Sequence, residues 1–296
     1  VRFVGETADD ALGEQRLRDG FARAGWNDIA VALEPEAAGF RFARTLERAS
    51  NVLIGDFGGG TSDFSVLRFE PGAGGAGGVT ALGHAGVGVA GDAFDYRIID
   101  NVVSPLLGKG GSFRVMGKEL PVPPGWFGSF ARWHRLSLMR APRTLREIAE
   151  VARTADHPER LHHLIRLIED EAGYALYQSV SAAKAALSQQ DGAVLRFVHG
   201  ALRVEAPVAR ADFERWIEPE LKQLGQAVDR ALEDSGLRAG EVDRVFLTGG
   251  TSLVPAVRRI FDDRFGAARV AGGGEFVSVA EGLALIGAHR HAGASA

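Results

Sequence analysis

One segment of the sequence has the residue types and spacing of a phosphate and magnesium site. It runs Asp56-Phe57-Gly58-Gly59-Gly60-Thr61-Ser62-Asp63. The three glycines allow backbone amides to turn toward an anion, and Thr61 adds a hydroxyl donor. Asp56 and Asp63 supply carboxylates that can hold a hydrated Mg²⁺ ion beside phosphate groups. The alternative is a plain glycine-rich hairpin tip, but such a tip needs at most two glycines and no flanking aspartates. The segment therefore favours a phosphate site.

A second glycine turn lies near the end of the chain. A predicted strand over 244–248 leads into Gly249, Gly250 and Thr251, and a helix is predicted from Pro255 to Phe265. This order brings backbone amides and the positive end of a helix to one point, which suits the phosphates or ribose of a nucleotide. Many such turns use glycine only for packing, so this turn alone leaves both interpretations open.

Alternating apolar residues predict the strands that position the first segment. Strands over 51–56 and 63–69 enclose it as a β-hairpin, and a third strand covers 79–82. Before them, the pattern predicts an amphipathic helix over 9–25 and a short strand over 29–33.

The rest of the chain is predicted to be mainly helical. Apolar spacing predicts one long helix over 161–188, a second hairpin over 193–205 and a helix over 212–235. Six prolines weaken the pattern over 101–160, which is interpreted as an irregular insertion. A last helix is predicted over 277–289.

Composition excludes several classes of protein. Hydrophobic residues make up 46% and charged residues 24% of the 296 residues, as in soluble globular domains. No apolar run is long enough for a membrane helix, and a net charge of -4 gives no basic footprint for nucleic acid. The absence of cysteine excludes disulfides and thiolate sites, and it fits a cytoplasmic location. Because Val1 rather than Met comes first, we expect a fragment that lacks its natural N-terminus.

Five motifs, in order, resemble the nucleotide-binding domain of Hsp70-type chaperones, within the actin, hexokinase and Hsp70 ATPase superfamily. They are Glu34-Pro35-x-Ala37-Ala38, Asp56-x-Gly58-Gly59-Gly60-Thr61-x-Asp63, Gly91-Asp92-Ala93-Phe94-Asp95, Ala183-Lys184-x-x-Leu187-Ser188 and Gly249-Gly250-Thr251. The bacterial YegD-like branch is closer still, through the segments 82–86, 105–108 and 270–279. The resemblance covers nearly the whole chain.

The resemblance implies an α/β fold of the actin-like (ribonuclease H-like) ATPase type, of which this chain holds the second lobe and a strip of the first. The implied parts are the end of lobe I at 1–50, lobe II at 51–275, and a helix at 276–296 that crosses back toward lobe I. Within lobe II, residues 51–90 and 211–275 would form an inner layer. Residues 91–210 would form an outer subdomain, which contains the insertion at 101–160.

It also implies ATP or ADP and Mg²⁺ as cofactors. The segment from Gly58 to Thr61 would form the second phosphate loop, with Asp56 catalytic and holding the metal through water. Glu34 would help to orient the attacking water, although it could equally be a carboxylate that ends a strand before Pro35. Asp63 is the last residue of this segment that the resemblance implies to bind the cofactor.

The other implied cofactor contacts come from later motifs. Gly249, Gly250 and Thr251 match the adenosine loop, and Gly91 matches the segment after the third strand. Lys184 and Ser188 match positions beside the adenine and ribose. A solvated lysine on the long helix is the alternative for Lys184.

Several departures from the family pattern bear on activity. Ser181 and Ala185 replace a glutamate and an arginine on the adenine side, and Leu253 stands where an arginine is expected. The first phosphate loop of the Asp-x-Gly-Thr type is absent from the sequence, as is a lysine expected between it and Glu34. We therefore expect weakened nucleotide affinity and no hydrolysis by this fragment alone.

The leading hypothesis is an Hsp70-like protein that binds ATP with Mg²⁺ and, when complete, hydrolyses it. Nucleotide state would control closure of the lobes. The expected role is of the chaperone type, without a peptide-binding domain. The alternative is a nucleotide-sensing adaptor or scaffold with little hydrolysis, which uses the insertion at 101–160 as a protein-partner surface. Trp126 and Trp133 in the insertion either anchor it or form an exposed patch. A sugar or acetate kinase is a weaker third option, since no second-substrate motif is found.

Overall fold

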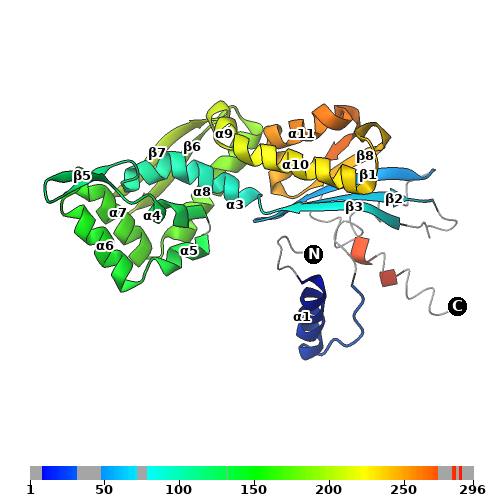
Figure 1. Cartoon of the computed structure of the whole chain (residues 1–296), viewed down its shortest axis with the longest axis horizontal. Coiled ribbons are helices and arrows are strands. Elements are labelled where there is room, and N and C mark those ends of the chain that lie inside the picture. The colour runs from blue at the N-terminus through cyan, green and yellow to red at the C-terminus, as the bar shows by residue number, and fades with distance from the viewer. Residues whose placement is uncertain are drawn as a thin grey trace. The chain divides into compact units, whose positions relative to one another are not determined.

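The computed structural model describes residues 9–31, 48–71, 79–131, 133–272, 282–284 and 287–288 (Figure 1). The chain divides into two compact units. Residues 1–90 and 221–296 form the first, named the sheet unit, and residues 91–220 form the second, named the helical unit.

The sheet unit is built on a mixed sheet of five described strands in the order β3-β2-β1-β8-β9. The strands are β1 (Ser50–Phe57), β2 (Ser62–Phe69), β3 (Val79–Val87), β8 (Arg244–Thr248) and β9 (Val270–Gly272). β1, β2 and β3 pair antiparallel, whereas β8 pairs parallel to β1 and to β9. The predicted hairpin, its third strand and an α/β fold with a mixed sheet are confirmed.

Apolar side chains cover both faces of this sheet. Helices α10 (Glu218–Ser235) and α11 (Pro255–Phe265) lie on one side of it in Figure 1. Phe261 of α11 contacts Phe57 and Phe64, with ring centroids 6.1 and 6.0 Å away. The opposite face carries a buried cluster of Val52, Ile54, Leu67 and Phe69. Each large apolar side chain buried in this way contributes about 1.5–3 kcal/mol, so both faces hold the strands in place.

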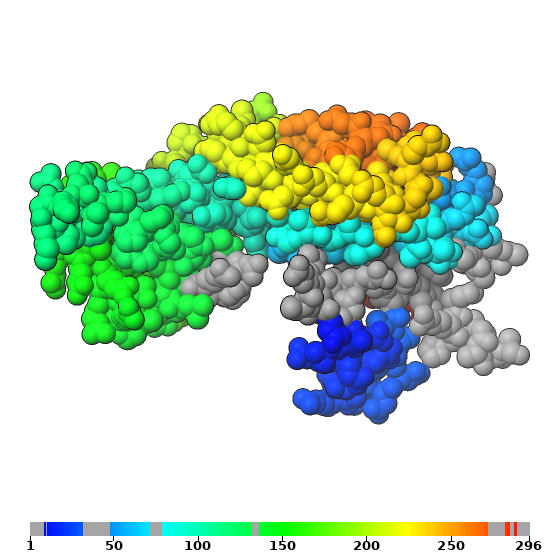
Figure 2. Space-filling model, viewed as in Figure 1, coloured from blue at the N-terminus to red at the C-terminus, as the bar shows by residue number. Residues whose placement is uncertain are grey.

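Strand β3 carries a β-bulge next to its contact with α10. Pairing with β2 shifts between Val66 and Leu67, which leaves Leu82 as the extra residue. At the adjacent Gly83, a Cβ atom would lie 2.5 Å from the carbonyl oxygen of Ala231. Figure 2 shows α10 lying directly along β3. The helix therefore packs on the strand backbone, and position 83 requires glycine.

The sheet unit also contains helix α1 (Asp10–Arg23), as predicted. The Asp9 side chain caps it by accepting a hydrogen bond from the N–H of Leu12 at 2.9 Å. The predicted strand over 29–33 is wrong in its described part, because residues 29–31 are not in a strand; residues 32 and 33 lie outside the described residues. The Arg18 guanidinium donates a hydrogen bond to the Ile29 carbonyl at 2.7 Å, so this oxygen is bonded to a side chain instead of a neighbouring strand.

The helical unit consists of helices and two hairpins. Phe94 and Phe213 pack edge to face in its core, with ring centroids 6.2 Å apart. Its elements are α3 (Gly91–Ile98), β4 (Ser112–Val115), β5 (Lys118–Pro121), α4 (Gly125–Gly128), α5 (Trp133–Leu138), α6 (Pro142–Ala152), α7 (Pro158–Glu169), α8 (Gly173–Gln189), β6 (Gly192–His199), β7 (Leu202–Ala209) and α9 (Arg210–Trp216).

The stretch 101–160 is not irregular, contrary to the prediction. It holds the β4–β5 hairpin and helices α4 to α6. Pro142 and Pro158 lie in the first turns of α6 and α7. Proline fits that position because the first turn does not use its N–H and the fixed φ suits the helix. These prolines start helices instead of preventing them.

Two helices predicted as continuous are interrupted. The predicted helix over 161–188 is α7 and α8, separated at Glu171, whose φ is +53°. The predicted helix over 212–235 is α9 and α10, separated at Ile217. Pro219 cannot donate a backbone hydrogen bond to the preceding turn, which explains a new start at α10.

The end of the chain is described only in part. Of the helix predicted over 277–289, residues 282–284 and 287–288 are described, and these are helical. Among the residues searched, no helix is both long enough and apolar enough to span a membrane.

Candidate functional site

The glycine segment is the loop of the β1–β2 hairpin. Phe57 pairs with Ser62, and the N–H of Gly58 donates to the carbonyl of Thr61 at 2.9 Å, which closes the loop. Residues 58–61 are exposed. A Cβ atom at Gly60 would have nothing within 4 Å, and its φ is not in the left-handed region. The fold therefore does not require glycine at position 60, although a ligand that approached the backbone closely would require it.

The second glycine turn packs directly on the base of this hairpin. Gly249 has a φ of +88°, and a Cβ atom there would lie 2.0 Å from the carbonyl oxygen of Phe57. No other residue fits this conformation and this contact. Two turns that are far apart in the sequence are thereby joined in one place.

The residues after Gly249 form a compact connection into α11. The Ser252 hydroxyl donates to the Gly249 carbonyl at 2.6 Å, and Thr251 and Ser252 are buried. A Cβ atom at Gly250 would meet nothing within 4 Å, so here too the fold itself does not require glycine. Leu253, at the position where an arginine was expected, is 59% exposed.

The two aspartates of the first segment lie on one face of the sheet. Asp56 on β1 is the register partner of Asp63 on β2 and of Thr248 on β8. Paired positions on neighbouring strands project to the same face, so the three polar side chains form a row at the base of the loop. Neighbouring carboxylates favour a cation, and Mg²⁺ is commonly held by one or two carboxylates with phosphate oxygens and water. The row fits the predicted Mg²⁺ ion.

Two other polar residues on this face were not predicted from the sequence. His84 on β3 places Nδ1 3.1 Å from Oγ of Ser65 and Nε2 3.7 Å from Oδ1 of Asp63. Thr248 is 8% exposed. Only strand pairing reveals that these residues adjoin the aspartates. In the part of the chain that is described, no group of three or more His, Asp or Glu side chains could hold a metal ion.

The helical unit brings two other predicted residues together. Lys184 Nζ lies 2.9 Å from Oδ1 of Asp95 and donates to the Gly91 carbonyl at 3.1 Å. Lys184 is therefore not a solvated lysine. Burial raises the pKa of Asp95 to about 6, although Lys184 acts in the opposite direction. The Ser188 hydroxyl donates to the Lys184 carbonyl, within the same helix.

Two expectations cannot be compared with the structure. Glu34 lies outside the described residues, and so does the Trp133 side chain. Trp126 is half-buried, beside the buried Phe127 and Phe130.

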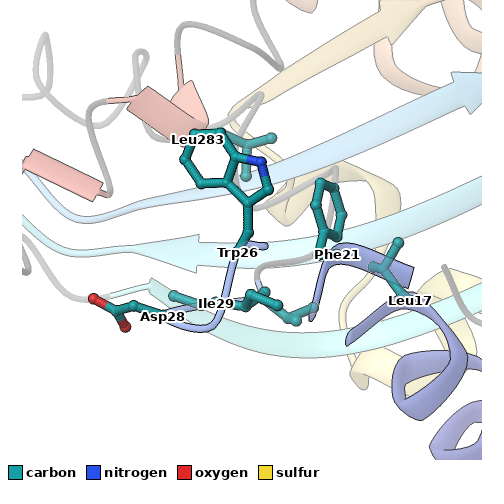
Figure 3. A pocket seen from close by; sticks show the side chains of 8 residues that line it. Leu17, Phe21, Trp26, Asp28, Ile29 and Leu283 are labelled. Carbon is teal, nitrogen blue, oxygen red and sulfur yellow. The ribbon is translucent and has the colours of Figure 1, made fainter. Parts of the chain in front are cut away.

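A separate apolar pocket of about 430 Å³ lies beside α1 (Figure 3). It is lined by Leu17, Phe21, Trp26, Asp28, Ile29, Ala30, Val31 and Leu283. One carboxylate is the only charge on this lining, which does not suit the phosphates of a nucleotide.

Comparisons with known proteins agree with the resemblance. The family model described as Hsp70 protein matches residues 162–293. The chain is 28% identical to Chaperone protein DnaK of Deinococcus radiodurans over 82% of this chain and 31% of the relative. It is 29% identical to Chaperone protein HscA homolog of Pseudomonas putida over 87% of this chain and 31% of that relative. The chain thus spans about a third of the length of these relatives, and the matched family region includes the second glycine turn but not the first.

Proposed function

We propose that this chain binds ATP or ADP with Mg²⁺ as part of an Hsp70-type ATPase. The observation that carries the proposal is the contact of Gly249 with the Phe57 carbonyl, which joins the two glycine turns beside Asp56 and Asp63. Similarity to the chaperones DnaK and HscA supports the same activity class.

Each part of the site has a role in this proposal. Backbone amides of residues 58–60 and the Thr61 hydroxyl bind phosphate oxygens, and the turn 249–251 binds adenosine. Bound Mg²⁺ would neutralise part of the phosphate charge. Asp56 would hold that ion through water and would help to place the water for in-line attack on the γ-phosphate. Glu34 assists in orienting this water.

The proposal for the whole protein goes further. Residues 1–50 belong to lobe I and residues 51–275 to lobe II of an actin-like ATPase of the YegD-like branch, acting in the cytoplasm. Nucleotide state sets closure of the lobes, and closure is the output that a chaperone-type role uses.

A nucleotide-sensing adaptor is the second candidate function. The observation that favours it is the β4–β5 hairpin of the insertion, because Met116 at its tip is 99% exposed and Val115 and Leu120 are 43% and 42% exposed. Exposed apolar side chains on a hairpin suit contact with a protein partner. Replacing Val115 and Met116 by polar residues should then abolish partner capture without changing ATP turnover.

The nucleotide proposal is tested by titrating residues 1–296 with ATP, ADP and adenosine in the presence of Mg²⁺. With one of the two phosphate loops in the sequence, we expect weak binding, little preference for ATP over ADP, and no hydrolysis. ADP should bind about tenfold more tightly than adenosine, the gain from one charge-assisted hydrogen bond. Micromolar affinity with a strong preference for ATP would show that the second loop alone suffices.

Gly60→Ala and Gly240→Ala form a matched pair for this test. At both positions a Cβ atom would meet nothing within 4 Å, so neither change should disturb folding. Gly60→Ala should remove the preference for ADP over adenosine because the methyl group blocks approach to the loop, and Gly240→Ala should retain it. If both variants keep the preference, phosphate does not bind at the hairpin.

A further inference from the structure

An ion pair between Lys184 of α8 and Asp95 of α3 is buried in the helical unit. The Lys184 and Asp95 side chains are 14% and 9% exposed, and the ammonium has two protein acceptors, the Asp95 carboxylate and the Gly91 carbonyl. Both acceptors belong to α3, which packs against α8. The lysine therefore holds the start of one helix against the middle of another.

The environment of Asp95 indicates what the lysine charge does. Burial disfavours its carboxylate, and nearby Asp92 adds a second negative charge, while Lys184 stabilises the ionised form. Removing one partner of a buried ion pair leaves an uncompensated charge, whereas replacing both by neutral groups is often harmless. The positive charge of Lys184 therefore compensates the negative charge of the buried Asp95.

We infer that Lys184 is a positioning residue that compensates Asp95 and fixes the Gly91 carbonyl, and that it does not contact the nucleotide. This inference rests on the proposed function and deepens it, because it changes the role of a residue expected beside the adenine and ribose. In this inference, helix α8 affects nucleotide binding only through its position, and the Lys184 ammonium interacts with Asp95 and Gly91 instead of the nucleotide.

A direct contact and a positioning role predict opposite results for one double variant. If Lys184 touched the nucleotide, Lys184→Met would weaken binding whatever stands at position 95. If Lys184 only compensates Asp95, then neutralising Asp95 removes the need for the lysine. Asp95→Asn should then rescue Lys184→Met.

The experiment measures the melting temperature and the ADP affinity of the whole chain for the wild type, Lys184→Met, and Lys184→Met combined with Asp95→Asn. Lys222→Met, which removes an exposed lysine of α10, is the control. Lys184→Met should lower the melting temperature and weaken ADP binding about tenfold or more. The double variant should return both quantities close to the wild-type values, and the control should change neither.

A double variant with a restored melting temperature but weak ADP binding would overturn the inference and assign Lys184 to the nucleotide. An unchanged melting temperature in Lys184→Met would overturn it as well. If Lys184→Met does not fold, folding of the double variant supports the inference and failure of both contradicts it. If the wild type binds no ADP, the proposed function fails, and rescue of the melting temperature alone decides whether Lys184 serves Asp95.

Discussion

The carbonyl oxygen of Phe57 lies where a side chain at Gly249 would have to begin, only 2.0 Å from the position of a Cβ atom. The second glycine turn, at Gly249, thus packs on the base of the first, at Phe57. Any displacement of Gly249 moves the end of β1, and with it Asp56, the residue before Phe57. The geometry of the carboxylate row and of the second turn is therefore set by one backbone contact.

Gly249→Ala should destabilise the protein more than Gly266→Ala. Both glycines have left-handed φ values, +88° and +84°, but a Cβ atom at Gly266 would meet nothing within 4 Å. Gly266→Ala should cost roughly 1–3 kcal/mol for backbone strain alone. Gly249→Ala should cost at least about 2 kcal/mol more because the methyl group collides with backbone. Urea unfolding measures both, and equal losses would contradict a close contact at Phe57.

Asp56→Asn should suppress ATP turnover by the complete protein more than it weakens ATP binding. The carboxylate is proposed to place charge and water at the reacting phosphate, and loss of such a preorganised group lowers kcat by on the order of 10²-fold. Steady-state kinetics and equilibrium titration separate the two effects. Unchanged kcat would remove Asp56 from the catalytic role.

Asp95 should make stability depend on pH. Its folded pKa, about 6, lies above the ordinary value of 3.8, so the folded state binds more protons than the unfolded state between these values. The free energy of unfolding should therefore fall as pH rises from about 4 to about 6, by up to about 3 kcal/mol. Asp95→Asn should lack this contribution. The difference between the wild type and this variant, measured by urea unfolding across that range, should change with pH, and a constant difference would refute the prediction.

Met116→Asn should stabilise the β4–β5 hairpin. Met116 and Gly117 form its two-residue turn with φ values of +49° and +78°, and asparagine adopts such values more readily than methionine. The free energy of unfolding should rise by roughly 0.5–1 kcal/mol. Met116→Ala removes the same exposed side chain without relieving the backbone, so it should give no gain, and a similar gain from both would assign the effect to the side chain.

The parts of the fold that follow from local patterns could be predicted from the sequence. The β1–β2 hairpin, the strand before Gly249 and helix α1 each have alternating or helical apolar spacing with a clear boundary residue. The insertion could not be predicted in this way, because a proline reads as a helix breaker unless the position of the helix start is already known. The break at Glu171 is likewise hard to predict, because glutamate itself adopts the positive φ and the nearby Gly173 lies inside the new helix.

The candidate site was predictable in its backbone parts and not in its side-chain partners. A run of glycines between strands identifies the loop around Gly60 by itself. The placement of Thr248 beside Asp56 depends on a parallel pairing between distant strands, and the pairing of Lys184 with Asp95 depends on how two helices dock. Such non-local contacts leave no signature in residue spacing.

The bulge at Leu82 decides which side of the sheet His84 occupies. Strand side chains alternate between faces, so one extra residue reverses the parity of everything beyond it. If Leu82 instead paired with Val66 in regular register, the continued pairing would place His84 opposite Phe64, toward the helices, instead of opposite Ser65 and beside Asp63. Loss of the Leu82 codon would therefore straighten the strand and leave the imidazole beside the carboxylates, because Ala81 and Gly83 already lie opposite Leu67 and Val66.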